Sequence, residues 1–174
     1  MAPADLRQNL SRCSRRTGNW LGFLACVLAL GLAFYSQYVL ELRPCHLCIF
    51  QRVTVAAMGL AFLLAMLHAG GRVSGAINAI LIGITGTATL AIAGRHVWLQ
   101  MQPPGSIPSC GADLDFMLEL FPVTEVIMKV FKAGGECAKV DFTLLGLSMP
   151  AWVFIFALVV TAGGIWINLR RTRA

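Results

Sequence analysis

Two cysteines separated by two residues are the most chemically informative feature of this sequence. Cys45-His46-Leu47-Cys48 stands directly before an apolar stretch, residues 49–68. Cysteines at this spacing can close a small disulfide ring, and a helix that begins here favours the thiolate form of a cysteine in its first turn. A dithiol at a lipid boundary predicts electron exchange between protein sulfur and a compound dissolved in the bilayer. A static disulfide or half of a metal site is the alternative interpretation.

Two further side chains can serve this chemistry. Arg52 follows Cys48 by four residues, so both share one helix face and the guanidinium can stabilise a thiolate or an anionic ligand. An arginine within hydrocarbon costs ~2.5–3.5 kcal/mol, which favours a functional role over snorkelling to the interface. His96 is expected just beyond the third apolar stretch, on the same side as Arg52. There it can donate to a quinone carbonyl or shuttle a proton; an interfacial histidine facing headgroups is the alternative.

Cys110 and Cys137 form a second candidate pair, 27 residues apart. A disulfide between them can staple the intervening segment, which by loop entropy would contribute roughly 3.5 kcal/mol. The turn-rich sequence before Cys110 and the Gly134-Gly135 pair before Cys137 indicate instead that both sulfurs can move. Mobility suits a disulfide that a partner protein attacks, so we predict thiol–disulfide exchange at this pair.

The composition predicts an integral membrane protein. The 174-residue chain is 57% hydrophobic and 13% charged, with a mean hydropathy of +0.74, whereas soluble domains carry about 25% charged residues. Four apolar stretches, residues 20–40, 49–68, 76–94 and 150–169, have the length of about 20 residues that a helix needs to cross hydrocarbon. We predict an all-α fold, a single transmembrane bundle of four helices. The first stretch is too long for a signal-peptide core and is expected to be a retained anchor.

The distribution of positive charge predicts the orientation of this bundle. With four spans, both termini and the connection 69–75 share one side, which carries eight arginines in 31 residues. The opposite loops, 41–48 and 95–149, carry five arginines and lysines in 63 residues. Because excess arginine and lysine marks cytoplasmic segments, we expect cytoplasmic termini, with the loops 41–48 and 95–149 on the outer side of the membrane. The net charge of +6 therefore reflects topology, and no nucleic-acid partner is expected.

The same topology sorts the six cysteines by compartment. Four of them are on the outer side or at its edge, where disulfides persist: Cys45, Cys48, Cys110 and Cys137. Cys13 is on the cytoplasmic side and Cys26 lies within the first span, so neither is expected to take part.

The long outer loop also contains an amphipathic segment, residues 113–132. Apolar side chains alternate there with acidic and basic ones, and Pro122 interrupts the pattern. We expect one or two short helices lying on the outer leaflet. A helix packed on the end of the bundle is the alternative.

Several of these residues together resemble the DsbB family of bacterial inner-membrane thiol oxidases. The resemblance rests on Arg43-Pro-Cys-His-Leu-Cys-Ile-Phe-Gln-Arg52, His96, Cys110, Glu136-Cys137-Ala138 and Leu145-Gly-Leu-Ser-Met-Pro-Ala-Trp152. It covers nearly the whole chain. One departure is Gln51, where many members are expected to carry glutamate; this changes the local charge but not the reaction class.

The resemblance implies a relay of disulfides. Reduced DsbA, a thioredoxin-like protein of the Gram-negative periplasm, would attack Cys110 of a Cys110–Cys137 disulfide. The freed Cys137 would attack Cys45 of a Cys45–Cys48 disulfide and leave Cys48 as a thiolate. The relay from DsbA through DsbB to quinone is the established example of this exchange chemistry.

The resemblance also implies the final electron acceptor. Cys48 would pass its electrons to a quinone of the inner membrane, held near Arg52 and His96. Ubiquinone is the expected acceptor, with menaquinone as the second candidate.

Two other classes of protein share parts of this pattern. A quinone reductase of the vitamin K epoxide reductase type is also a helical bundle with a C-x-x-C motif, but there the active motif comes late in the bundle. A thiolate metal-binding membrane protein would use the four outer cysteines and His96. Tetrahedral zinc sites pair two closely spaced cysteine motifs, which the distance between Cys110 and Cys137 does not match, and no resident metal is expected.

Overall fold

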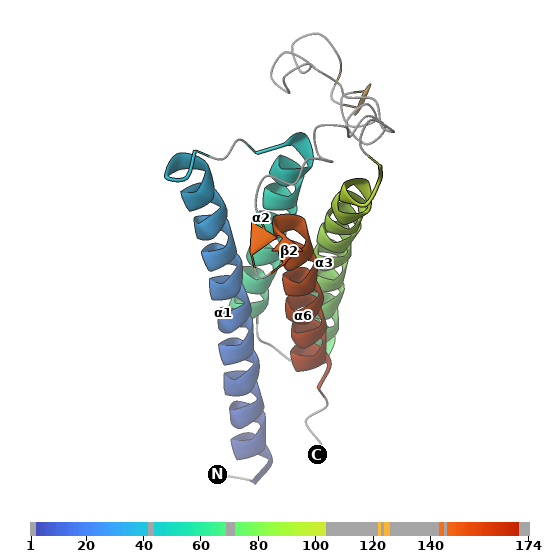
Figure 1. Ribbon diagram of the computed structural model, residues 1–174. Coiled ribbons are helices and arrows are strands. Elements are labelled where there is room, and N and C mark those ends of the chain that lie inside the picture. Colours follow the sequence, from blue (N-terminus) through green and yellow to red (C-terminus); the bar gives the residue numbers. More distant parts are fainter. Residues whose placement is uncertain are drawn as a thin grey trace.

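Within the residues that it describes, the computed structural model contains four long helices and a short β-hairpin (Figure 1). It describes residues 3–41, 44–68, 72–103, 122, 124–125, 143–144 and 146–170, with the side chains of the first helix described from residue 15 on. The helices are α1 (Pro3–Tyr38), α2 (His46–Leu67), α3 (Arg72–Gln100) and α6 (Met149–Leu169). Strands β1 (Thr143–Leu144) and β2 (Leu147–Ser148) pair antiparallel just before α6. The predicted all-α membrane bundle is confirmed.

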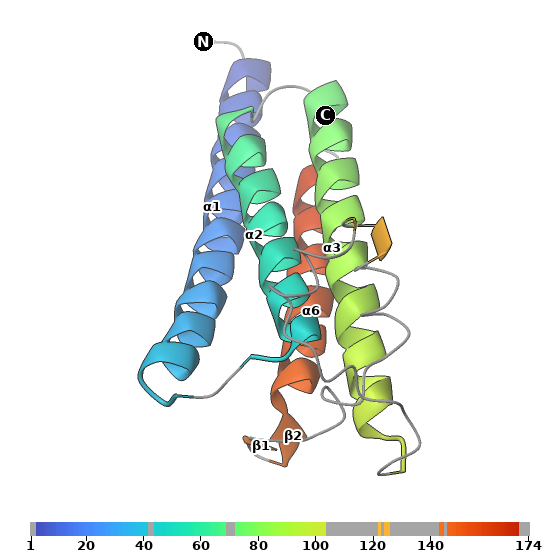
Figure 2. The same ribbon diagram turned by 90° about the horizontal axis from the view of Figure 1, so that it is seen from above.

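The four helices pack in a ring of antiparallel neighbours. α1 packs against α2, α2 against α3 and α3 against α6, while α6 closes the ring on α1 through a smaller contact (Figure 2). The start of α1 and the end of α6 lie at one end of the bundle (Figure 1). The start of α2 and the end of α3 therefore meet at the opposite end.

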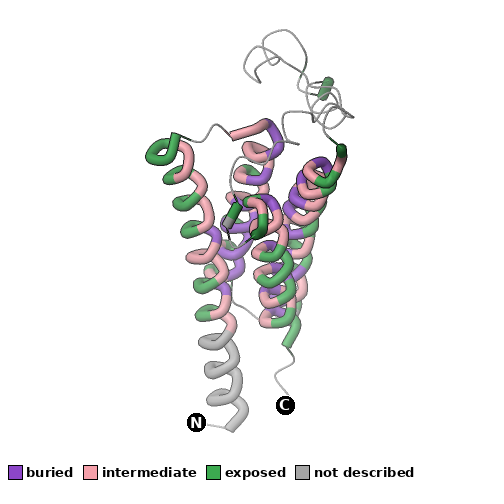
Figure 3. Tube along the Cα trace, viewed as in Figure 1, coloured by how far each residue is buried: buried purple, intermediate pink, exposed green. Residues whose placement is uncertain are grey.

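The outward faces of the helices are suited to lipid. All four are long and apolar enough to cross a membrane. Figure 3 shows buried residues on the faces where helices meet and exposed residues on the outer faces. Large apolar side chains there are 60–74% exposed, among them Leu28, Leu32, Val53, Val73, Ile84 and Val159. Contiguous apolar surface on this scale is stable against hydrocarbon and not against water.

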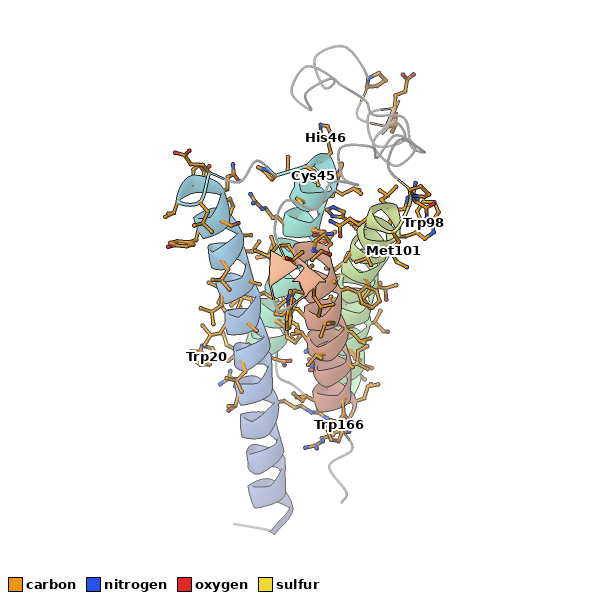
Figure 4. All side chains as sticks on the ribbon, viewed as in Figure 1. Trp20, Cys45, His46, Trp98, Met101 and Trp166 are labelled. Atoms are coloured by element: carbon orange, nitrogen blue, oxygen red, sulfur yellow. The ribbon has the colours of Figure 1, made fainter. Side chains whose placement is uncertain are left out.

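Tryptophans paired with arginines mark the two ends of the bundle. The Arg95 guanidinium lies 4.4 Å from the centre of the Trp98 ring, and that of Arg170 lies 3.9 Å from the Trp166 ring. Figure 4 shows Trp98 and Trp166 toward opposite ends of the bundle. Amphipathic rings and cations are typical of the membrane–water interface, so the bundle spans from one interface to the other.

The packed core surrounds Phe62 of α2. This side chain is buried in a cluster that includes Cys26, Val55, Met58 and Ile82. A β-carbon at Gly22 of α1 or Gly164 of α6 would lie 2.6 Å from the Phe62 ring. The two helices approach the ring this closely because both positions are glycine, as expected where van der Waals packing joins helices in lipid.

A buried pair of asparagines joins α1 to α6. The Asn168 amide donates to Asn19 Oδ1 at 2.8 Å, and the Asn19 amide donates to Asn168 Oδ1 at 3.3 Å. Asn168 also donates to the Gly164 carbonyl at 2.9 Å. Each amide therefore satisfies the other inside the bundle, where no water would.

The observed helices extend beyond the expected spans at both ends of the bundle. At the inner end, α1 begins at Pro3, well before residue 20, and α3 begins at Arg72. α2 begins at His46, within the C-x-x-C motif, and α3 continues through residues 95–100, which the apolar pattern assigns to the outer loop. The helix continues because His96 and Leu99 are buried. Of the amphipathic segment 113–132, only Pro122, Thr124 and Glu125 are described, so that prediction lies outside the described residues, as do Cys110 and Cys137.

Adjacent glycines of α6 provide a test of this packing. Gly164→Ala places a methyl group against the buried Phe62 ring and should lower the free energy of unfolding by about 1–3 kcal/mol. A β-carbon at Gly163 would meet no neighbouring side chain within 4 Å among the described residues, so Gly163→Ala should be neutral or slightly stabilising. Thermal unfolding of the purified variants in detergent measures both. Equal stability of the two variants would contradict the proposed close contact.

Candidate redox site

The C-x-x-C motif forms the beginning of α2. Cys45 is the N-cap residue, with extended backbone angles (φ −71°, ψ 167°), and its carbonyl accepts from the Ile49 amide at 3.2 Å. The preceding Pro44 lacks an amide hydrogen, so a helix that arrives from the N-terminal side is not expected to run through this position into α2. Cys48 falls in the first turn, where the backbone amides and helix dipole stabilise a thiolate. Figure 4 shows Cys45 and His46 at the end of the bundle where Trp98 also lies.

The two sulfurs of the motif are in contact. The Cys45 thiol donates to the Cys48 sulfur with 3.1 Å between the sulfur atoms. Both side chains are half-buried. Small side-chain rotations therefore suffice to interconvert a dithiol and a disulfide at this position.

His96 of α3 lies directly against Cys45. Its Nε2 is 3.6 Å from the Cys45 sulfur, and its Nδ1 is 3.2 Å from Gln51 Nε2 of α2. The histidine is 2% exposed and the glutamine 5%, so both are enclosed between the helices. When the Gln51 amide donates to Nδ1, the imidazole proton is on Nε2 and points to sulfur; when the amide is turned over, Nε2 can accept instead. The His96 ring can therefore either donate a hydrogen bond to the Cys45 sulfur or accept one from its thiol.

Arg52 is held from the opposite side, by α1. Its guanidinium donates to the Ala33 carbonyl at 2.8 Å and to Gln37 Oε1, and it lies 5.2 Å from the centre of the Phe34 ring. The cation therefore has two acceptors and an aromatic face within the bundle. It lies one helical turn beyond Cys48.

The structure brings some of the predicted site residues together. Cys45, Cys48 and His96 form one cluster, while Arg52 is tied to α1 next to it along α2. The sequence pattern does not identify two residues that the structure places in the site. Gln51 is noted in the sequence only because it replaces the expected glutamate, and Gln37 is not noted at all. The signal available for both is an amide in an otherwise apolar stretch, where a polar group needs a partner.

Comparisons with known proteins identify the family of this chain. The chain matches the family model described as Disulfide bond formation protein DsbB over residues 15–167. A relative named Disulfide bond formation protein B from Nitrosococcus oceani is 42% identical over 155 residues, which cover 89% of this chain and 92% of the relative. Relatives of the same name from Hahella chejuensis and Methylococcus capsulatus are 41% and 42% identical over 160 residues, covering 92% and 91% of this chain and 97% and 98% of their own length.

The chain belongs to the DsbB family. The predicted resemblance is therefore confirmed, and the vitamin K epoxide reductase type is not the family of this chain. As a DsbB-family member the chain is a multi-pass bacterial membrane protein of disulfide-bond formation. The matched range includes all six predicted site residues, namely Cys45, Cys48, Arg52, His96, Cys110 and Cys137.

The tie between Arg52 and α1 predicts a measurable loss of stability. Gln37→Leu removes one acceptor of the guanidinium and should lower the free energy of unfolding by about 1.5–3 kcal/mol, the range for a hydrogen bond to a charged group. Gln102→Leu is the matched control, because the Gln102 amide makes a 3.4 Å bond at the exposed end of α3. Denaturation in detergent micelles compares the two, and an equal effect would refute the buried tie.

Proposed function

We propose that this chain oxidises the dithiol of a DsbA-like periplasmic protein and passes the electrons to a membrane quinone. One observation gives this proposal its strongest support. A dithiol with touching sulfurs begins a membrane-spanning helix, and a buried histidine lies against one of the two sulfurs. Such a dithiol is accessible both to protein thiols in water and to an oxidant dissolved in lipid.

The first exchange involves the second cysteine pair. A thiolate of the DsbA-like protein attacks Cys110 of a Cys110–Cys137 disulfide, which forms a mixed disulfide and releases the Cys137 thiolate. The second thiol of the partner then attacks the mixed disulfide, so that the partner leaves with its own disulfide and Cys110 is released as a thiolate. The partner's two electrons remain on Cys110 and Cys137.

The second exchange moves these electrons to the helix. Cys137 attacks Cys45 of a Cys45–Cys48 disulfide, and Cys48 leaves as a thiolate in the first turn of α2. Cys110 then attacks the resulting Cys45–Cys137 bond and restores the outer disulfide. The N-terminus of α2 supports Cys48 as the leaving group, because Cys48 lies in the first turn and its thiolate is stabilised there.

His96 is proposed to move the proton of Cys45. When Cys45 and Cys48 re-form their disulfide, two protons must leave the dithiol together with two electrons. His96 Nε2 lies 3.6 Å from the Cys45 sulfur, and Gln51 can hold the ring in either neutral tautomer. His96 thereby accepts the proton from the Cys45 sulfur, and Gln51 orients the ring.

Arg52 is proposed to orient the quinone beside Cys48. The quinone is a substrate, because it takes up two electrons and two protons and leaves as quinol. Ubiquinone is the proposed acceptor, with menaquinone as the second candidate. The Arg52 guanidinium and the Phe34 ring together offer a cation and an aromatic face near the start of α2, and His96 is the second proposed quinone contact.

The cycle also requires an orientation in the membrane. We propose cytoplasmic termini and a periplasmic dithiol in a Gram-negative inner membrane. The arginine excess near the termini supports this orientation.

The cysteine roles predict a selective loss of turnover. Cys48→Ser should abolish quinone reduction by purified protein supplied with a reduced DsbA-like protein and ubiquinone, because serine cannot carry the electrons. Cys26→Ser, which alters a buried core thiol away from the dithiol, should retain turnover. Quinone absorbance follows the reaction. Substantial activity of Cys48→Ser would overturn the proposed role of this thiol.

The role of Arg52 predicts a change in quinone affinity. Arg52→Lys keeps the charge but loses the planar fork, so the KM for ubiquinone should rise on the order of tenfold, or about 1.4 kcal/mol, with a smaller change in kcat. Arg95→Lys, at the outer end of α3, is the matched control and should leave this KM unchanged. An unaltered KM in Arg52→Lys, in protein that unfolds at the wild-type temperature, would remove the proposed contact.

A further inference from the structure

Three potential metal ligands converge at the start of α2. The sulfurs of Cys45 and Cys48 and a ring nitrogen of His96 all lie within 4.8 Å of one another. We propose that in the reduced protein these three side chains form a binding site for a thiophilic divalent cation, Zn²⁺, that arrests the redox cycle. This ion is an inhibitor and not a resident cofactor.

Two of the three distances between the ligand atoms are close to those of a zinc site, and all three are within 4.8 Å. Tetrahedral coordination, with Zn–S of about 2.3 Å and Zn–N of about 2.0–2.1 Å, places ligand atoms about 3.5–3.8 Å apart. His96 Nε2 and the Cys45 sulfur are already 3.6 Å apart. The two sulfurs, now 3.1 Å apart, must separate by about 0.7 Å to reach tetrahedral geometry. A small rotation of either half-buried cysteine provides this movement.

The chemistry of the ligands selects the metal. Two thiolates and a neutral imidazole compensate the charge of a divalent ion and suit zinc, whereas calcium and magnesium require oxygen ligands. Two cysteines and one histidine leave the fourth position for water, as in open zinc sites. The half-buried sulfurs give the ion access from the outer end of the bundle.

Gln51 orients the His96 ring from the side away from the sulfurs. A histidine that binds metal through Nε2 carries its proton on Nδ1 and donates it to a neighbouring group, which orients the ring. Gln51 lies 3.2 Å from Nδ1 and is buried, and its amide can turn to present oxygen to this proton. The ring is therefore already oriented toward the sulfurs before the ion arrives.

Metal binding and disulfide formation exclude each other here. Coordination releases two thiol protons and transfers no electrons, and it occupies the sulfur lone pairs that a Cys45–Cys48 bond would need. The oxidised pair offers no thiolate, so the ion binds only the reduced protein. The binding site does not depend on the proposed oxidase function; only the inhibition of turnover rests on it.

Cobalt(II) is a suitable probe, because it takes the same coordination as zinc and is coloured. We expect reduced full-length protein carrying Cys110→Ser and Cys137→Ser, prepared without oxygen, to bind one Co²⁺ per chain with tetrahedral d–d bands and thiolate-to-cobalt charge transfer. Zn²⁺ should bleach these bands. In the same background, His96→Ala should weaken cobalt binding at least tenfold, and Gln51→Leu should weaken it on the order of tenfold.

Two control variants separate this site from other thiols and imidazoles. Cys26→Ser and His46→Ala alter a buried thiol and the histidine next to Cys45, and neither belongs to the three-ligand cluster. Both should leave cobalt binding unchanged. Spectra that lack charge-transfer bands, or that are unaffected by His96→Ala, would overturn the site.

A second measurement uses the unaltered protein and needs no variant to fold. Zn²⁺ should slow alkylation of Cys45 and Cys48 in the reduced chain, read for each cysteine by peptide mass, and should leave Cys26 unaffected. Unchanged alkylation of the pair in the presence of Zn²⁺ would refute binding. Turnover assays distinguish the two proposals. If the protein reduces quinone but Zn²⁺ does not protect Cys45 and Cys48 from alkylation, only the metal site is refuted. If Zn²⁺ protects the two cysteines but the protein does not reduce quinone, only the oxidase function is refuted.

Discussion

Polar side chains that enter the hydrocarbon of a membrane must find hydrogen-bond partners inside the protein, and this constraint organises the bundle. Asn19 and Asn168 satisfy each other between α1 and α6. Arg52 of α2 finds a carbonyl and an amide oxygen on α1. His96 of α3 is held by Gln51 of α2. Each of these polar groups thus joins two helices, and together the contacts link α6 to α1, α1 to α2 and α2 to α3.

This arrangement gives the two faces of α2 different chemical character. The face toward α3 carries Gln51 and meets His96 beside Cys45, a neutral network that can relocate a proton. The face toward α1 carries the Arg52 guanidinium against the Phe34 ring, a cation beside an aromatic surface. The dithiol at the start of the helix stands between them. The two proposed quinone contacts, His96 and Arg52, therefore lie on different sides of one short stretch of helix.

The inner part of the bundle supports this outer end. Phe62 fills the space between helices that approach through Gly22 and Gly164, so α1, α2 and α6 are tightly packed around this ring. A rigid base lets the start of α2 and the end of α3 keep three reactive atoms within 4.8 Å. The same convergence that suits rapid disulfide exchange suits coordination of a thiophilic ion, so metal sensitivity would be a consequence of how the redox site is built.

Features that depend on local composition and spacing can be predicted from the sequence. Apolar length predicts the four membrane helices, the spacing of Cys45 and Cys48 predicts a dithiol at a helix start, and the residues around Arg52 indicate the family. Which side chains meet is a property of the folded bundle. The apolar stretch ends at Gly94, yet α3 continues because His96 and Leu99 are buried. That His96 reaches Cys45, and that Arg52 turns to Gln37, depends on how each helix is rotated about its axis, and this rotation is set by packing against neighbours and not by local sequence.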